Sequence, residues 1–199
     1  NLIVHPIPSL TDNITYLLVD RISLVCVLVD VSDPESTNIA IQLINLMHYP
    51  GRILNIKAVL TTHKHWDHSA GNIEIRKLFP TISRVYGGKV DNVLGCTNFV
   101  SHGDVIKIPN FSIGIKVIAV PGHTRGSIVY SVDSISGMAY FTGDTLFSCG
   151  CGASFERGQG ERGELATQRA ICELYYTVAK NLKLEDVLVF SGHEYTSQL

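Results

Sequence analysis

Seven potential metal ligands constrain the fold of this chain, because four are clustered and three come from distant segments. The cluster is Thr-His-Lys-His-Trp-Asp-His at residues 62–68. The other three arrive singly in Pro-Gly-His-Thr, Thr-Gly-Asp-Thr and Ser-Gly-His-Glu, each directly after a glycine. The seven residues are His63, His65, Asp67, His68, His123, Asp144 and His193. A fold that uses them together must bring four separate segments to one place.

Short β-branched segments and stretches with helical spacing predict the elements that carry these ligands. Strands are expected at residues 2–4, 14–19, 24–29, 58–60, 84–86, 111–120, 127–132, 138–141 and 187–190. Helices are expected over residues 69–79, over 167–182, and from Ser36 or Thr37 to about residue 47. In the last of these, one face would carry Ile39, Leu43, Leu46 and Met47. This order predicts an α/β (α+β) chain in which two sheets are stacked between helices.

The composition indicates one globular domain and excludes some classes of partner. The chain has 199 residues, of which 45% are hydrophobic and 17% charged, so residues 1–199 are expected to form a single domain. A net charge of -2 gives no reason to expect nucleic acid or an anionic membrane as partner. The longest apolar stretch, residues 24–31, is far shorter than the ~20 residues that cross a bilayer.

The cysteines favour a reducing compartment. There are five, an odd number with irregular spacing, which suits reduced thiols in the cytoplasm or the mitochondrial matrix better than a disulfide framework. Cys149 and Cys151 are one residue apart, which suits a disulfide badly, so we expect both to be buried thiols.

The ligand types predict a catalytic centre with two metal ions. Imidazole nitrogens and carboxylate oxygens suit zinc, iron and manganese, and no paired-cysteine pattern indicates a closed structural zinc site. His63 and His65 share one side of a loop that leaves a strand, whereas Asp67 and His68 can face the opposite way toward a second ion. Asp144 has two oxygens and can bridge the ions. A metal-bridging hydroxide then serves as the nucleophile, with Asp67 and Asp144 as the catalytic carboxylates that hold its metals.

Other histidines and one further aspartate have different expected roles. His5, His48 and His102 are each isolated in sequence and are expected to be ordinary surface or core residues. Asp30 follows an apolar strand, and two interpretations stay open for it: a turn residue, or a residue that orients a ligand histidine.

The motifs closely resemble the metallo-β-lactamase superfamily, and within it glyoxalase II, the hydroxyacylglutathione hydrolases. The HxHxDH pattern at residues 63–68 is typical of the whole superfamily. Trp66, the Gly-Asp-Thr-Leu-Phe segment at 143–147 and the His-Glu-Tyr-Thr segment at 193–196 narrow the resemblance to the glyoxalase II branch. The resemblance spans the whole chain and implies a four-layer αββα sandwich.

The resemblance also implies a ligand assignment and a reaction. One metal would be held by His63, His65 and His123, the other by Asp67, His68 and His193, with Asp144 between them. The family uses zinc, and often iron or manganese, and it hydrolyses S-D-lactoylglutathione to D-lactate and glutathione. A glutathione thioester is therefore the expected small-molecule partner. A thiolate whose conjugate acid has a pKa of about 8.5 can leave without a strong proton donor, so the chemistry is consistent.

The glutathione site of the family is only partly retained. In glyoxalase II the Gly-Cys-Gly segment is followed by Lys-Phe-Tyr, whose lysine and tyrosine help hold glutathione, but residues 150–152 are followed here by Ala-Ser-Phe. The cation is lost at Ala153, and Phe155 keeps the ring without the hydroxyl. Tyr195 is the tyrosine that remains to line the cleft.

Two further features concern the substrate. Two interpretations stay open for the glycine-rich segment at residues 156–163: Arg157 or Arg162 binds a peptide carboxylate of the substrate, or the segment is a solvated loop with mixed charges. Glyoxalase II continues past His-Glu-Tyr with a helical substrate-binding region, which we expect to be absent here because the sequence stops at Leu199. The chain is then either a fragment or short isoform, or a relative with a reduced glutathione site.

Two other functions compete with the thioester hydrolase. A persulfide dioxygenase on the same fold uses one iron held by two histidines and an aspartate, and the intact second set of ligands here argues against it. A metal-binding paralogue without a substrate pocket would serve as a scaffold or regulator.

Overall fold

Two mixed β-sheets face each other in the computed structural model, which describes residues 2–134, 137–154, 156, 165, 168–169, 171–172, 174, 176 and 187–195. The first sheet has the order β1-β2-β3-β4-β5-β6 and the second β11-β10-β9-β8-β7. The strands of the first are β1 (Leu2–Ser9), β2 (Asn13–Asp20), β3 (Val25–Val29), β4 (Asn55–Leu60), β5 (Arg84–Gly88) and β6 (Asn98–Val100). Those of the second are β7 (Val105–Ile106), β8 (Ile115–Ala119), β9 (Ile128–Ser134), β10 (Gly137–Gly143) and β11 (Val187–Ser191).

Strand β3 shows why the longest apolar stretch lies at the centre of the molecule. Val25, Val27 and Val29 pack into the core between the two sheets, together with Tyr130 and Phe141 of the second sheet. The alternate residues of β3 point the other way and pack against the helices. Because side chains alternate along a strand, a strand buried on both faces must be apolar at every position.

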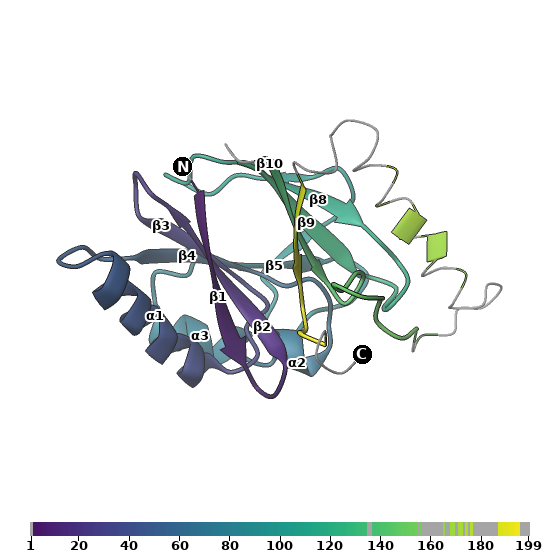
Figure 1. Ribbon diagram of the computed structural model, residues 1–199, viewed down its shortest axis with the longest axis horizontal. Helices are drawn as coiled ribbons and strands as arrows, with labels where there is room; N and C mark the ends of the chain where they lie inside the picture. Colours follow the sequence, from purple (N-terminus) through teal and green to yellow (C-terminus); the bar gives the residue numbers. More distant parts are fainter. Residues whose placement is uncertain are drawn as a thin grey trace.

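Helices α1 (Pro34–His48) and α3 (Asn72–Leu78) cover the outer face of the first sheet, as Figure 1 shows. On the outer face of the second sheet, Leu174 packs with Val120, Val129 and Tyr140. The described residues between 165 and 176 are helical, within the region expected as a helix over 167–182. The layers are therefore helix, sheet, sheet and helix, as the sequence predicted. None of the helices in the described part of the chain is long and apolar enough to cross a membrane.

Helix α1 differs from its prediction at its start and on its buried face. The cap is Asp33, whose side chain accepts hydrogen bonds from the backbone of Glu35 and Ser36, and Pro34 occupies the first turn. The buried residues are Thr37 and Ile41. The face predicted to be apolar is instead exposed, at 59%, 53%, 70% and 71% for Ile39, Leu43, Leu46 and Met47. The prediction was wrong because α1 carries another set of apolar residues at helical spacing, which includes Ile41, and it is this set that packs on the sheet.

Other boundaries also differ from the sequence prediction. The helix expected over 69–79 is two helices, α2 (Trp66–Ser69) and α3, with a break at Gly71. A side chain at Gly71 would approach Val31 Cγ1 to 2.6 Å, so this position fits tightly against the end of β3. Strands β6 and β7, of three and two residues, were not predicted. Cys149 and Cys151 are exposed rather than buried, because they lie in the turn after β10, outside both sheets.

All four ligand-bearing segments leave the carboxyl ends of strands at one edge of the sandwich. Strands β3, β4 and β5 are parallel neighbours, so the segments after β3 and β4 emerge on the same side. Strands β8 and β10 are both antiparallel to β9, and β11 is parallel to β10, which brings the segments after β8, β10 and β11 together. Loops at the carboxyl ends of strands are a common place for functional residues.

The capping of α1 gives a stability prediction. Asp33→Ala is expected to lower the free energy of unfolding by about 1 kcal/mol, because it leaves backbone N–H groups of the first helical turn without an acceptor. Ser36→Ala keeps the Asp33 acceptor and is expected to have the smaller effect. Chemical denaturation of both variants measures the difference, and an effect of Ser36→Ala as large as that of Asp33→Ala would contradict the assignment.

Candidate metal centre

Asp30 holds the loop that carries the histidine cluster. Its Oδ1 accepts the Thr62 backbone N–H at 2.8 Å, and its Oδ2 accepts the Thr62 hydroxyl at 2.8 Å. The same Oδ2 lies 3.0 Å from His68 Nδ1. Asp30 has a positive φ of 53°, so it also turns the chain at the end of β3. The two interpretations of this residue therefore both apply.

Three imidazoles meet in a first cluster, made of His63, His65 and His123. His63 Nε2 lies 3.0 Å from His65 Nδ1, and His123 Nε2 lies 2.9 Å from the same atom. His63 and His123 are buried, and His65 is partly exposed. The alternate residues of the loop thus converge, and the histidine after β8 joins them.

A second cluster contains Asp67, His68 and His193. His193 Nε2 lies 3.3 Å from Asp67 Oδ2 and 3.2 Å from His68 Nε2. Asn13 Nδ2 donates to Asp67 Oδ2 at 3.0 Å, which fixes the carboxylate against the β1–β2 turn.

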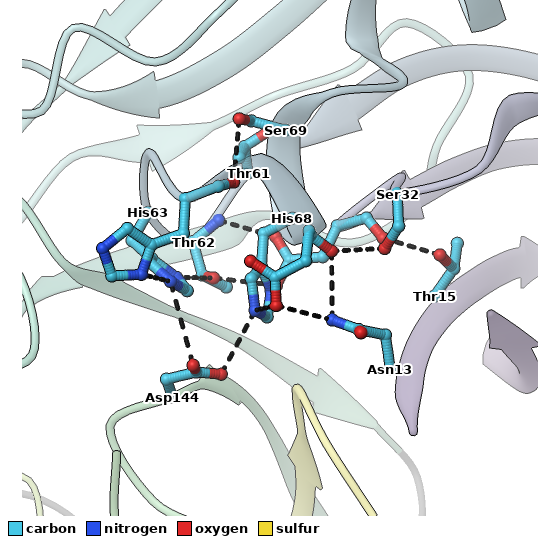
Figure 2. Close-up of polar contacts among 12 residues, drawn as sticks. Asn13, Thr15, Ser32, Thr61, Thr62, His63, His68, Ser69 and Asp144 are labelled. Carbon is cyan, nitrogen blue, oxygen red and sulfur yellow. Dashed lines mark hydrogen bonds and ion pairs between the residues drawn. The ribbon is translucent and has the colours of Figure 1, made fainter. Parts of the chain in front are cut away.

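Asp144 lies between the two clusters and faces both, and Figure 2 shows it opposite His63 and His68. Its Oδ2 is 3.3 Å from His123 Nε2 and 3.9 Å from His63 Nε2. Its Oδ1 is 3.3 Å from the Nε2 atoms of both His68 and His193. This Oδ1 is buried and accepts no well-aligned hydrogen bond, although both imidazoles lie within ion-pair distance. A buried carboxylate oxygen in this state is costly unless a cation or a proton balances it.

Hydrogen bonds at the Nδ1 atoms of His68, His123 and His193 show that the Nε2 atoms of these rings face the clusters. The Ala153 carbonyl oxygen lies 2.6 Å from His123 Nδ1, and a carbonyl can only accept, so this Nδ1 donates. Asp12 Oδ1 lies 2.7 Å from His193 Nδ1, and Asp30 accepts from His68 in the same way. In a neutral imidazole, the Nε2 atom then carries a lone pair directed into the cluster. Lone pairs about 3 Å apart repel one another, and metal cations remove that repulsion.

The histidines of the two clusters differ in their pKa values. Burial, reinforced by the neighbouring His68, keeps the pKa of His63 well below its ordinary value, and burial also lowers the pKa of His123. For His193, burial is outweighed by Asp144 and Asp67, which raise the pKa to about 10. Asp30 and Asp144 likewise raise the pKa of His68 despite its burial. In the metal-free protein, the protonated imidazoles are therefore His68 and His193 of the second cluster.

Two of the glycines that precede ligands are required because other segments pack closely against their backbone. Gly143 has a φ of 52°, and a Cβ there would lie 2.8 Å from Thr62 Cβ. At Gly192 a Cβ would lie 2.7 Å from both His68 Cε1 and Asp144 Oδ1. The glycines seen in the sequence thus let the strand ends approach each other to ligand distance.

Only part of the predicted substrate site can be placed. Tyr195 stacks on the His193 ring with centroids 5.0 Å apart, and Phe147 packs edge-on against Tyr195. Phe155, Arg157 and Arg162 lie outside the described residues.

Several residues around the centre were not predicted from the sequence. They are Asp12, Asn13 and Asp91, which contact ligands or the loops that carry them. No motif marks these residues. The histidines His5, His48 and His102 are not members of either cluster, and His5 instead contacts the Tyr49 hydroxyl at 3.0 Å.

The fold and the site together define the class of protein. The model of the metallo-beta-lactamase superfamily matches residues 15–193, and the chain belongs to this superfamily. A crystal structure of the BLEG-1 B3 metallo-beta-lactamase superimposes with a TM-score of 0.75 at 20% identity, over 96% of this chain and 92% of that one. The likeness supports the αββα fold, and membership of the superfamily with this His/Asp cluster implies divalent metal binding.

Within that superfamily, the chain is similar to hydroxyacylglutathione hydrolases. It is 39% identical to the cytoplasmic hydroxyacylglutathione hydrolase of Arabidopsis thaliana, over 97% of this chain and 68% of the relative. It is 34% identical to the probable hydroxyacylglutathione hydrolase glo2 of Schizosaccharomyces pombe, over 93% and 65%. The chain thus spans about two thirds of the length of these relatives. ETHE1 from Myxococcus xanthus is 26% identical, with a TM-score of 0.73, over 98% of this chain and 76% of that one.

Proton release on metal binding tests the charge assignment. With a pKa raised to about 10, His193 is protonated at pH 7 in the metal-free chain, so an ion that binds its Nε2 must displace that proton. Zinc added to metal-free protein in a weakly buffered indicator solution is expected to release protons, and zinc affinity should fall as the pH is lowered. His193→Ala should release fewer protons. Binding without any proton release would contradict the assignment.

Proposed function

We propose that this chain is a dinuclear metal-dependent hydrolase of glutathione thioesters, with S-D-lactoylglutathione as substrate and D-lactate and glutathione as products. The observation that carries the proposal is the Asp144 carboxylate, which directs one oxygen at each cluster. The first ion would be held by His63, His65 and His123, and the second by Asp67, His68 and His193. The similarity to hydroxyacylglutathione hydrolases supports the choice of substrate.

The geometry suits thioester hydrolysis. Divalent cations in the two clusters would supply Lewis acidity and would acidify a solvent molecule. Asp67 and Asp144 have pKa values far below the ordinary range, because hydrogen bonds and charges from His193 and His68 outweigh their burial. Both therefore stay ionised and act as ligands rather than as proton donors. No strong acid is needed, since a thiolate with a conjugate-acid pKa of about 8.5 is an adequate leaving group.

Tyr195 is the described residue best placed to contact the substrate. It is partly buried at the edge of the second cluster, where it stacks on His193. Burial and the neighbouring carboxylates, Asp12 first among them, raise the pKa of its hydroxyl, so the hydroxyl keeps its proton and can donate to a substrate oxygen. Phe155 and Arg157 are proposed as further substrate contacts on sequence grounds alone.

The cofactor and compartment follow from the donor set and the cysteines. Imidazoles and carboxylates without thiolate ligands suit zinc first, with iron or manganese as alternatives. The five cysteines are all free thiols. Together with the cytoplasmic name of the Arabidopsis relative, they support a reducing compartment, the cytoplasm or the mitochondrial matrix. A single catalytic domain over residues 1–199 stays a prediction.

Metal content and substrate preference test the proposal together. Purified chain reconstituted with zinc is expected to contain two equivalents and to hydrolyse S-D-lactoylglutathione faster than a thioester without the glutathione moiety. Chelation of the metal should abolish hydrolysis of both thioesters, and added zinc should restore it. One equivalent of iron with oxygen consumption would favour a persulfide dioxygenase, and two equivalents of zinc without hydrolysis of either thioester would favour a scaffold.

Replacement of the shared carboxylate should remove catalysis. Asp144→Ala is expected to lower kcat/KM by at least about two orders of magnitude, because it removes a ligand from both ions at once. Asp133→Ala is the matched control, since Asp133 is exposed and pairs only with Lys116 among the ion pairs of the described chain. Full activity of Asp144→Ala at saturating zinc would exclude the bridging role.

Tyr195→Phe separates substrate contact from metal binding. The variant keeps the ring that stacks on His193 and loses only the hydroxyl, so zinc content should stay at the wild-type value. The KM for S-D-lactoylglutathione is expected to rise about 5- to 10-fold, the loss of one hydrogen bond worth about 1 kcal/mol. Steady-state kinetics measure it, and an unchanged KM and kcat would remove Tyr195 from the substrate site.

A further inference from the structure

Asp91 is a buried carboxylate outside both clusters that joins the two loops of the first cluster. Its Oδ2 accepts the Lys64 backbone N–H at 3.0 Å, and Lys64 lies between His63 and His65. The same oxygen accepts the Thr124 hydroxyl at 2.7 Å, and Thr124 follows His123 directly. Asp91 is only 5% exposed. A single carboxylate therefore touches the neighbours of all three histidines of the first cluster.

The other oxygen of Asp91 extends this contact along the loop after His123. Oδ1 accepts the Gly126 backbone N–H at 2.8 Å. A Cβ at Gly126 would lie 2.6 Å from Asp91 Cγ, so the glycine is needed for the loop to pack on the carboxylate. Three donors from two loops thus meet two acceptor oxygens. An asparagine would set an NH₂ group against at least one of these donors, so the site requires a carboxylate.

A second carboxylate bridges the same two loops. Glu156 forms an ion pair with the Lys64 ammonium and accepts the Arg125 backbone N–H at 2.8 Å. Lys64, Arg125, Asp91 and Glu156 line one cavity of about 360 Å³. The hydrogen bonds that Asp91 accepts from these two loops reduce the cost of burying its carboxylate.

We infer that Asp91 is a positioning residue for the first metal site and holds the His63–His65 loop and the His123 loop at ligand distance. The inference rests on the proposed metal-binding function. The second site has its own supports, Asp12 on His193 and Asn13 on Asp67, and Asp91 makes no hydrogen bond to Asp67, His68 or His193. Loss of Asp91 should therefore weaken one site and spare the other. Residues that orient metal ligands typically change metal affinity by about 10- to 100-fold when replaced.

The experiment is a zinc titration of the metal-free full chain, followed through the NMR signals of individual histidine rings. In Asp91→Asn, half-saturation of the His65 and His123 signals is expected at about 10- to 100-fold higher free zinc than in the wild type. The His193 signal should titrate as in the wild type. An equal shift of all three signals, or no shift, would overturn the inference.

Matched variants separate positioning from general damage to the fold. Asp133→Asn changes an exposed aspartate in the same way and should leave every titration unchanged. If Asp91→Asn does not fold, Thr124→Val removes one donor to Asp91 at nearly constant volume and should shift the first site alone, whereas Thr124→Ser should restore it. A Thr124→Val chain that titrates like the wild type would then count against the inference.

The zinc titration also distinguishes failure of the Asp91 inference from failure of the proposed function. Wild-type chain that binds no zinc on these histidines would remove the metal centre itself. Wild-type chain that binds two ions, combined with an Asp91→Asn chain that binds them equally well, would leave the proposed function intact and remove only the role of Asp91.

Discussion

The close approach of buried imidazoles and carboxylates at one edge of the sandwich is the constraint on which the structure depends. Six candidate ligands from three segments direct nitrogen or oxygen atoms into a small volume, and Asp144 adds two more oxygens between them. Hydrogen bonds on the outer side of His68, His123 and His193 prevent these rings from turning away. Protons on His193 and His68 balance the carboxylates of the second cluster when no metal is bound, and cations would balance both clusters. The folding energy that permits this close approach comes from the apolar core between the sheets.

The sandwich supplies both the energy and the geometry. Strand β3 is apolar at every position, and the polar Asp30 follows directly after its end. Parallel pairing in the first sheet, and the directions of the strands in the second, place the carboxyl ends of β3, β4, β8, β10 and β11 at one edge. Gly143 and Gly192 then allow the two sheets to approach at that edge. The ligands converge because of this topology, although they are far apart in sequence.

The sequence predicted which segments come together at the two clusters, because the signals of these segments are local. A glycine before a histidine or aspartate, at the end of a β-branched segment, can be recognised without knowledge of the fold. Asp12, Asp91 and Asn13 could not be recognised, since each acts through a contact with a segment far away in the chain. The buried face of α1 was wrong for a related reason. Two sets of apolar residues have helical spacing there, and only the position of the sheet selects Ile41 over Leu43.

The two halves of the centre are held by different forces. The second half contains Asp67 beside His68 and His193, so its attraction for a cation is largely electrostatic and tolerates small displacements. The first half is made of three imidazoles with one shared carboxylate oxygen, and neutral donors bind well only at the correct distance and angle. Precision therefore matters more in the first half. The bridges made by Asp91 and Glu156 lie beside that half, which is where loop position has the larger effect on affinity.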